Sequence, residues 1–253
     1  MRLRDKITII TGAGSGIGHE AAKLFAIEGA YVVVVDRNAD AAHRVAAEIS
    51  AASGKAEAAI VDVSQEMALK SVIDDVAARH GRLDVLVNNA GFGFAGTVVT
   101  TSEADWDALM AVNVKGVFFG CKHAIPIMTR QGGGVIINTA SAVANVGITD
   151  RAAYVASKGA VAALTRAMAM DHVADGIRIN CVAPGTIESP YFAEIFVRSN
   201  DAPALRAGLE ARQAMNRLGQ PAEIAKAMLY LACDDSSFCT GTTLFADGGW
   251  TAR

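Results

Sequence analysis

The sequence predicts an α/β fold in which a doubly wound parallel sheet of seven strands carries helices on both faces. Short runs rich in β-branched residues alternate with longer segments whose apolar residues recur at helical spacing. The strand-like runs are apolar on both faces, which is typical of strands buried between two layers of helices. Right-handed crossovers between parallel strands then complete a doubly wound arrangement.

The elements follow one another in a regular order along the chain. The predicted strands are 7–10, 31–35, 58–61, 85–87, 135–137, 177–182 and 243–245. The predicted helices are 18–28, 39–51, 66–80, 103–127, 153–174 and 221–232. This alternation indicates a Rossmann fold. Residues 184–216 break the pattern with about thirty extra residues where a handful is usual, so we expect this insertion to cover the substrate.

Composition limits the classes of protein that the chain can represent. Its 253 residues suit one domain, 1–253, and the net charge of −3 offers no basic surface for nucleic acid. Four cysteines without a C-x-x-C pair predict buried, reduced thiols and no metal site. No signal peptide pattern and no apolar run of about 18 residues is found, so we expect a cytoplasmic protein that does not enter membranes.

A glycine-rich loop follows the first strand and opens the first helix. Residues 11–18 read T-G-A-G-S-G-I-G, so Ile17 stands where the common G-x-G-x-x-G pattern has its third glycine. The match is to T-G-x-x-x-G-x-G. Glycines let backbone N–H groups approach a pyrophosphate, and a helix N-terminus favours its charge. The loop therefore indicates dinucleotide binding, although a glycine loop alone also fits an ordinary turn.

Asp36 ends the second strand, 20 residues after Gly16. A carboxylate there accepts hydrogen bonds from an adenosine ribose and repels a 2′-phosphate, which favours NAD over NADP. Two alternatives stay open: Asp36 caps the next helix, or Arg37 receives a phosphate. Asp62, after the third strand, is either an adenine contact or a turn residue.

A second group of residues carries the chemistry of an acid/base catalyst. Tyr154 and Lys158 are four residues apart in a helical pattern, so their side chains share one face. We expect the ammonium to lower the tyrosine pKa and favour the phenolate. Ser141, just past the fifth strand, can hydrogen-bond a substrate oxygen or serve only as a turn residue. Asn113 is polar amid apolar residues, and a water chain to Lys158 would satisfy it.

Taken together, these motifs resemble those of the short-chain dehydrogenase/reductase family, in its branch of single-domain enzymes of this length. The resemblance spans nearly the whole chain and includes N-N-A-G at 88–91, P-G at 184–185 and D-G-G at 247–249. It implies a catalytic tetrad of Asn113, Ser141, Tyr154 and Lys158. It also implies a homotetramer built on helices 103–127 and 153–174, with the tail after Asp247 reaching toward a neighbour.

The resemblance completes the expected cofactor site. Lys158 would also hold the nicotinamide ribose, and Ile187 would meet the carboxamide through its backbone. Family members often carry threonine where Ser189 stands, which puts the packing of that contact in doubt. The residues predicted to bind NAD are Gly12, Ser15, Gly16, Ile17, Gly18, Asp36, Arg37, Asp62, Val63, Asn89, Ala90, Gly91, Tyr154, Lys158, Pro184, Gly185, Ile187 and Ser189.

The substrate is less well indicated. Arg151 stands three residues before Tyr154 and Arg212 lies in the insertion, and guanidinium groups suit a carboxylate. This part of the chain is similar to family members that act on hydroxy acids, such as 3-hydroxybutyrate or 3-deoxy sugar acids. Both arginines also fit a solvated surface, and Glu188 nearby would repel an acid if it faced the pocket. We therefore predict substrate binding by Ser141, Arg151, Tyr154 and Arg212.

The predicted function is hydride transfer between NAD and a secondary alcohol or ketone, such as a hydroxy acid or sugar acid. A neutral sugar, cyclic alcohol or diol is the alternative substrate. A catalytically silent dinucleotide-binding module is a weaker alternative, because such a protein need not retain all four members of the tetrad. The methionines at 168, 170, 215 and 228 are expected to fill the core rather than to form a binding surface.

Overall fold

Seven parallel strands form one sheet in the order β3-β2-β1-β4-β5-β6-β7 in the computed structural model, which describes residues 1–252. The strands are β1 (Ile7–Thr11), β2 (Tyr31–Asp36), β3 (Lys55–Ile60), β4 (Val85–Asn88), β5 (Gly134–Thr139), β6 (Ile177–Pro184) and β7 (Thr243–Ala246). The strand order changes direction between β1 and β4, which both pair in parallel. At such a switch point the connections diverge, and a crevice opens beyond the carboxyl ends of the strands.

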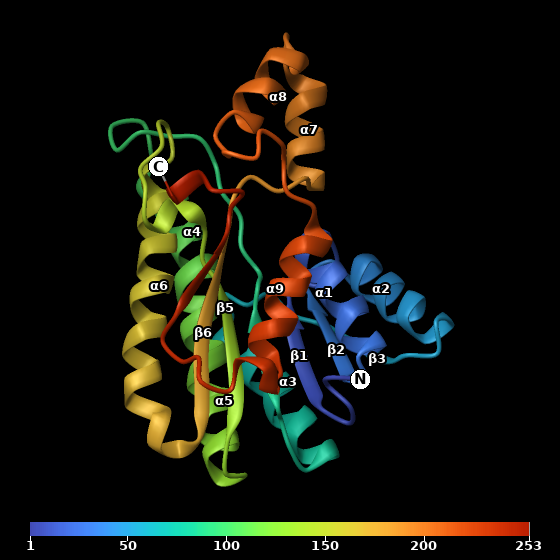
Figure 1. Cartoon of the computed structure of the whole chain (residues 1–253). Coiled ribbons are helices and arrows are strands. Elements are labelled where there is room, and N and C mark those ends of the chain that lie inside the picture. The colour runs from blue at the N-terminus through green and yellow to red at the C-terminus, as the bar shows by residue number, and fades with distance from the viewer. Residues whose placement is uncertain (253) are drawn as a thin grey trace.

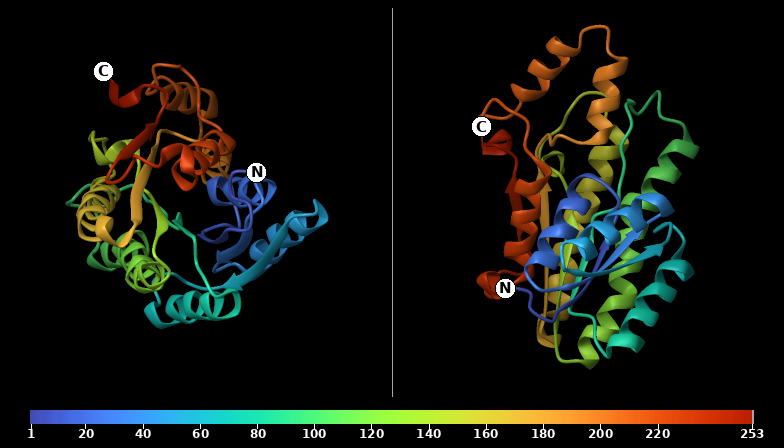
Figure 2. Two further views of the ribbon diagram at one scale, coloured as in Figure 1. Left: turned by 60° about the horizontal axis from the view of Figure 1, so that its bottom comes forward. Right: turned by 90° about the vertical axis from the view of Figure 1, so that its right-hand side faces the viewer.

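Helices cover both faces of this sheet, as the sequence predicts (Figures 1 and 2). One layer contains α1 (Gly16–Ile27), α2 (Ala39–Ala51) and α9 (Pro221–Ala232). The other contains α3 (Glu66–His80), α4 (Glu103–Met110), α5 (Gly116–Arg130) and α6 (Ala152–His172). Side chains that alternate along each strand divide the core into two clusters, so that Ile136 faces the α5 side and Ile137 the α1 side.

Most elements differ from their predicted bounds by one or two residues at an end, and two differ more. The strand expected at 58–61 is β3, Lys55–Ile60, which pairs with β2 over its full length. Its first residues lack β-branched side chains, so pairing with a neighbour decides their conformation. The single helix expected at 103–127 is divided by a π-helical turn, Ala111–Lys115, between α4 and α5. This turn contains Asn113, and π turns of this kind often mark functional sites.

The insertion at 184–216 contains two helices, α7 (Pro190–Arg198) and α8 (Ala202–Glu210). Ser189 and Asp201 cap them by accepting hydrogen bonds from the backbone of Phe192 and Ala204. The pair projects beyond the carboxyl ends of the strands (Figure 1). It therefore lies on the side of the sheet where the predicted catalytic residues emerge.

The prediction of buried residues was wrong for Met170, Met215 and Cys239. Met168 and Met228 are buried, but Met170 is 74% exposed and Met215 is 67% exposed. The spacing of apolar residues in a helix or a loop does not by itself show whether these two methionines face the core or the solvent. The cysteines are free as expected, and Cys121, Cys181 and Cys233 are buried, whereas Cys239 is partly exposed.

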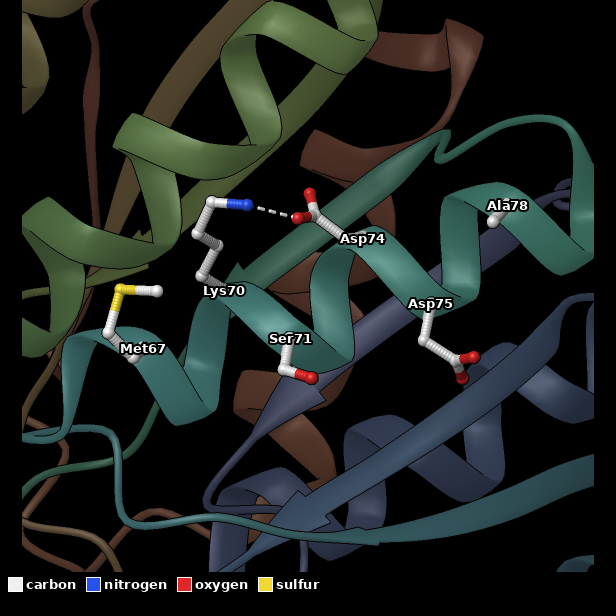
Figure 3. A pocket seen from close by; sticks show the side chains of 6 residues that line it. All are labelled: Met67, Lys70, Ser71, Asp74, Asp75 and Ala78. Carbon is white, nitrogen blue, oxygen red and sulfur yellow. Dashed lines mark hydrogen bonds and ion pairs between the residues drawn. The ribbon is translucent and has the colours of Figure 1, made fainter.

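A hollow of about 450 Å³ lies on the outer face of α3. Figure 3 shows its side chains along one helix, with an ion pair between Lys70 and Asp74. None of the residues predicted for the site lines it, so it is a solvated helix surface. Among residues 1–252, no helix is long and apolar enough to cross a membrane, and no grouping of three or more His, Cys, Asp or Glu could hold a metal.

Candidate active site

The glycine loop between β1 and α1 has a shape that only glycines permit. Gly12 and Gly16 have φ of +64° and +55°, which L side chains rarely adopt. A Cβ on Gly18 would lie 2.2 Å from the Gly12 carbonyl oxygen. Ser15 is exposed and forms the N-cap of α1, and Ile17 packs against the core below the loop. The loop thus presents backbone N–H groups at a helix N-terminus, as a pyrophosphate requires.

Asp36, at the end of β2, is bound to the same loop. Its Oδ2 accepts a hydrogen bond of 2.9 Å from the Gly14 N–H, and its Oδ1 accepts one of 3.0 Å from Asn38 N–H. The cap of α2 is Asn38, whose side chain accepts from Ala41, so Asp36 does not have that role. Arg37 is exposed. The Asp36 carboxylate remains beside the loop, where an adenosine ribose would meet it.

Asp62 follows β3 and Asn89 follows β4, and of the two only Asn89 holds the glycine loop. Asp62 accepts hydrogen bonds from the backbone and hydroxyl of Ser64, which hold its pKa below the usual value. Asn89 Nδ2 donates to the carbonyl oxygens of Thr11 and Gly12. The turn role of Asp62 is therefore filled, while its predicted contact with adenine stays a prediction.

Further members of the predicted cofactor site line the crevice. The backbone N–H groups of Asn89 and Ala90 donate to the Thr11 hydroxyl, and Val63 is buried against Gly116. A Cβ on Gly185 would lie 2.8 Å from Asp247 Cα, and Ile187 is buried and bridged to Gly219. Pro184 ends β6 beside them, and the Ser189 hydroxyl is used as the α7 cap.

Lys158 and Asn113 meet behind Gly91. A Cβ on Gly91 would lie 3.1 Å from Asn113 Oδ1 and 3.4 Å from Lys158 Nζ. Lys158 is buried and donates to the Thr139 carbonyl oxygen at 2.8 Å, and burial lowers its pKa to about 8. Asn113 Oδ1 accepts from Phe92 N–H, and its Nδ2 donates to the Phe92 carbonyl and to Ser157 Oγ. Protein groups therefore bind both polar atoms of Asn113, and the water chain to Lys158 stays a prediction.

Tyr154 shares one face of α6 with Lys158, whose Nζ lies 5.8 Å from the centre of the tyrosine ring. Burial raises the pKa of Tyr154, while a hydrogen bond with Ser141 and the charge of Arg151 act in the opposite direction. The expected net lowering of this pKa is not found, because burial outweighs the groups that lower it. The phenol is thus the favoured form in the chain without ligands.

The strand end that carries Ser141 offers an observation on cofactor fit. Ser141 is 7% exposed, and its hydroxyl accepts a hydrogen bond of 3.4 Å from Val143 N–H. Thr139, two residues earlier, is 8% exposed, and its buried Oγ1 has no partner within the protein. By alternation along β5, Thr139 faces the layer that includes Ala13 of the glycine loop and Ile187. A ligand in the crevice would satisfy this hydroxyl, so the residues present fit a dinucleotide.

The two predicted substrate arginines lie near each other at the mouth of the site. Arg151 is the N-cap of α6. Burial is the largest cause that lowers the pKa of Arg212, and the positive charge of Arg151 is the second. The Arg212 guanidinium stacks over Trp250 at 5.7 Å from the ring centre. Trp250 lies on the C-terminal segment, which Asp247 holds by hydrogen bonds to Gly249 and Thr251.

Glu188 forms an ion pair with Arg206 of α8. This pairing neutralises the acidic charge that would otherwise oppose an anionic substrate. Arg206 also pairs with Glu210 at 2.9 Å and lies over the Phe196 ring. The root of the insertion is thereby joined to α8 through charged side chains.

Sequence reasoning missed three residues of the site. Ser157 links Asn113 to the Tyr154 carbonyl oxygen, to which its hydroxyl donates at 2.8 Å. Gly93 lies against the Tyr154 ring, where a Cβ would be 2.9 Å from Cδ2. Tyr191, at the start of α7, is close enough for its charge to raise the pKa of Tyr154. Only Ser157 gave a usable signal, as a small polar residue one position before Lys158.

Comparisons with known proteins agree with this geometry. Residues 12–251 match a family model described as Enoyl-(Acyl carrier protein) reductase. The chain is 42% identical to a meso-2,3-butanediol dehydrogenase of Serratia marcescens, covering 100% of this chain and 97% of that protein. It is 38% identical to a 2-keto-3-deoxy-L-fuconate dehydrogenase of Xanthomonas campestris, covering 99% and 81%.

A solved structure is also very similar. It is described as a short-chain dehydrogenase/reductase from Burkholderia xenovorans, with a TM-score of 0.96 and 34% identity. The match covers 100% of this chain and 98% of the other. The similarity therefore extends over the helical insertion as well as the sheet.

Proposed function

The chain belongs to the short-chain dehydrogenase/reductase family, and on that premise we propose that it is an NAD-dependent dehydrogenase interconverting a secondary alcohol and a ketone. The family's oxidoreductases act on alcohol groups with a nicotinamide dinucleotide. The observation that carries the proposal is the meeting of Tyr154, Lys158, Ser141 and Asn113 at one crevice beside a fitting dinucleotide cradle. A silent binding module would not need this arrangement.

Tyr154 is the proposed acid/base. When bound, the nicotinamide would accept the hydride from the carbinol carbon or return it to the ketone. Tyr154 takes the hydroxyl proton during oxidation and donates it during reduction. Because burial raises its pKa, the unliganded tyrosine holds its proton and is ready to donate. Abstraction of a proton requires further stabilisation of the phenolate, which hydrogen bonding to Ser141 and the charge of Arg151 supply in part.

The other members of the tetrad have distinct proposed roles. Ser141 hydrogen-bonds the substrate oxygen as negative charge develops there. Lys158 would hold the nicotinamide ribose. Its ammonium donates a hydrogen bond to the Thr139 carbonyl oxygen, which keeps it at the base of the crevice. Asn113 joins the Phe92 backbone to Ser157 and so keeps the loop after β4 against α6.

The cofactor is proposed to be NAD rather than NADP. Asp36 presents a carboxylate at the loop, and a 2′-phosphate placed beside it would be repelled. The proposed holding residues are those predicted from the sequence, from Gly12 to Ser189, together with Thr139. Of the predicted set, the Ser189 hydroxyl and the Asn89 amide are already engaged with backbone groups.

The substrate is proposed to carry a carboxylate. Arg151 and Arg212 bring two cations to the mouth of the site, close to Tyr154, and the Glu188 charge is taken up by Arg206. The sugar acid relative from Xanthomonas campestris supports an acidic substrate. The butanediol dehydrogenase relative supports the alternative, a neutral diol or cyclic alcohol.

Initial rates on a panel of alcohols test this proposal. The panel contains hydroxy acids, sugar acids, neutral diols and cyclic alcohols, each assayed with NAD and with NADP. We expect the highest kcat/KM for an acid with NAD. A higher value for neutral diols would replace the acid by the alternative substrate class, and absence of turnover across the panel would contradict the enzyme itself.

A homotetramer in the cytoplasm is also proposed. Large apolar side chains are exposed on the helices expected at the interface, with Trp106 at 40%, Phe118 at 46% and Met170 at 74%. Light scattering during gel filtration measures the mass directly. A monomer at micromolar concentration would contradict this assembly.

A further inference from the structure

A network of charged side chains surrounds the glycine loop at its adenosine end. Gly14 is buried at the centre of the loop, and its peptide groups are held from two sides. The Gly14 N–H donates to Asp36 Oδ2 at 2.9 Å. The Gly14 carbonyl accepts from Arg44 Nη2, also at 2.9 Å. Arg44 of α2 therefore holds the Gly14–Ser15 peptide, which adjoins the Ala13–Gly14 peptide whose N–H binds the Asp36 carboxylate.

Arg44 is itself held by two further residues. Its Nη1 donates to Glu48 Oε1 at 2.8 Å, one turn along α2. The second Glu48 oxygen lies 2.7 Å from Nε2 of His19 on α1. The chain of contacts runs from α1 through Glu48 and Arg44 to the loop and ends at Asp36. It joins three elements that together surround the place of the adenosine ribose.

Packing shows that this arrangement tolerates little displacement. A Cβ on Gly14 would lie 2.8 Å from both Asp36 Oδ2 and Ala41 Cβ. The Asp36 carboxylate is thus in direct contact with the loop, and its hydrogen bonds from the N–H groups of Gly14 and Asn38 set its direction. Arg44 holds the adjacent Gly14–Ser15 peptide through the Gly14 carbonyl, so it acts on Asp36 through the backbone of Gly14.

Charge adds a second effect. An arginine beside the adenosine ribose would ordinarily attract a 2′-phosphate. Here Arg44 Nη1 donates to Glu48 and Nη2 donates to the Gly14 carbonyl, while the side chain is 52% exposed. The Glu48 carboxylate partly balances the Arg44 charge and so weakens its attraction for an anionic ligand.

From these contacts we infer that Arg44 is a positioning residue that selects the unphosphorylated adenosine ribose, and that Glu48 maintains this selection by neutralising it. The inference rests on the proposed function, because it concerns the cofactor of that reaction. Arg44 acts through Gly14 and Asp36, and it takes no part in the chemistry at Tyr154.

Direct binding to the purified chain tests the inference without relying on turnover. Dissociation constants for NADH and NADPH are measured by calorimetry at low ionic strength, with ADP and 2′,5′-ADP as probes of the adenosine half alone. The variants are Arg44→Gln, Arg44→Lys and Glu48→Gln. Arg79→Gln is the matched control, because Arg79 also bridges two carboxylates, Glu57 and Asp75, on an exposed surface away from the loop.

The two charge variants are expected to act in opposite ways. Arg44→Gln should weaken NADH and ADP binding about five- to tenfold and change NADPH binding less than about twofold. Arg44→Lys should restore part of the NADH affinity. Glu48→Gln should tighten NADPH and 2′,5′-ADP binding about threefold or more, a gain that declines as salt is added. Arg79→Gln should leave all four constants unchanged.

Several results would overturn the inference. Equal weakening of NADH and NADPH in Arg44→Gln would reduce Arg44 to a general support of the loop, and unchanged binding would remove it altogether. If Arg44→Gln fails to fold, unchanged NADPH affinity in Glu48→Gln is sufficient to refute the inference. Tighter binding of NADPH than NADH by the unaltered chain would instead refute the proposed NAD preference, and Arg44 selection with it.

Discussion

The glycine loop and the α7–α8 insertion meet at the same crevice but are held by different kinds of contact. The loop is fixed by backbone geometry, with left-handed glycines and positions that have no room for a Cβ. The insertion is fixed by side chains, through the Arg206 ion pairs and the contact of Arg206 in α8 with the Phe196 ring in α7. Substitutions easily change side-chain contacts such as those of the insertion, but they hardly change the backbone geometry of the loop. The difference teaches that the glycine loop owes its shape to backbone geometry, whereas the insertion depends on replaceable side chains.

Loss of the Tyr154 hydroxyl should give the largest effect and should not depend on the substrate. Tyr154→Phe is expected to lower kcat by about 10³-fold or more, because general acid/base catalysis is removed. Calorimetric NADH affinity should stay close to that of the unaltered chain. A variant that retains most of its turnover on any substrate of the panel would contradict the assignment of the acid/base.

Lys158 is expected to lower the stability of the folded chain, because its ammonium is buried. Burial lowers its folded pKa to about 8 from an unfolded value near 10.5, so the unfolded chain binds the proton more tightly. Stability should therefore rise as pH increases from 8 toward 10.5. Lys158→Met should abolish this rise and increase the free energy of unfolding at pH 7 by roughly 1–3 kcal/mol. Urea unfolding at pH 7 and pH 9.5 measures both; a variant with the same pH dependence as the unaltered chain would exclude a buried, depressed lysine.

The substrate side should respond selectively. Arg151→Leu or Arg212→Leu is expected to lower kcat/KM for a hydroxy acid about 10- to 100-fold, the range of a charge-assisted hydrogen bond. A neutral diol should be affected less than about threefold. Equal losses for both substrates would dispose of the carboxylate pocket. Retained NADH affinity serves as the control that the rest of the crevice is intact.

Two glycines offer a direct test of the comparison. Gly14→Ala should reduce the free energy of unfolding by about 1–3 kcal/mol and weaken NADH binding, since its Cβ would be 2.8 Å from Asp36 and Ala41. Gly208→Ala, in α8, meets nothing within 4 Å and should be neutral or stabilise the protein by up to about 1 kcal/mol. Thermal unfolding distinguishes them. If Gly14→Ala is tolerated as well as Gly208→Ala, the loop is less constrained than its contacts indicate.

The smallest effect is expected at the surface of the insertion. Arg206→Ala removes ion pairs to Glu188 and Glu210 but should leave the stability nearly unchanged, because exposed pairs are screened by solvent. With Glu188 released, KM for an acidic substrate should rise while KM for a neutral diol stays constant. A change in both KM values would instead indicate that Arg206 orders the insertion as a whole.

Local patterns account for what could be predicted from the sequence. The alternation of strands and helices, the glycine loop and the helical spacing of Tyr154 and Lys158 are each contained in a short stretch of chain. Asp36 was similarly indicated by its distance from the loop. These features suffice for the fold, and they brought most of the predicted site to one crevice.

Features that depend on distant contacts could not be read in the same way. The start of β3 is decided by pairing with β2, and Met170 and Met215 are exposed because of where neighbouring elements end. The sequence led us to expect that Lys158 acts on Tyr154, whereas burial dominates both pKa values. Tyr191 affects Tyr154 although 37 residues (191 − 154) separate them in the sequence. None of these follows from spacing along the chain.

The π turn at 111–115 has a consequence for insertions and deletions in this chain. A π turn accommodates one residue more than the α-helix around it, so α4 and α5 are not one regular α-helix. Asn113 can therefore point toward Ser157 and Phe92 while α5 keeps Val117, Cys121 and Ala124 in the core. Deleting Val112 would remove the extra residue and let α4 and α5 continue as one α-helix, with the core face of α5 kept in register. The wide turn that directs Asn113 toward Ser157 and Phe92 would then be lost, so a single-codon deletion here should displace the asparagine while sparing the core.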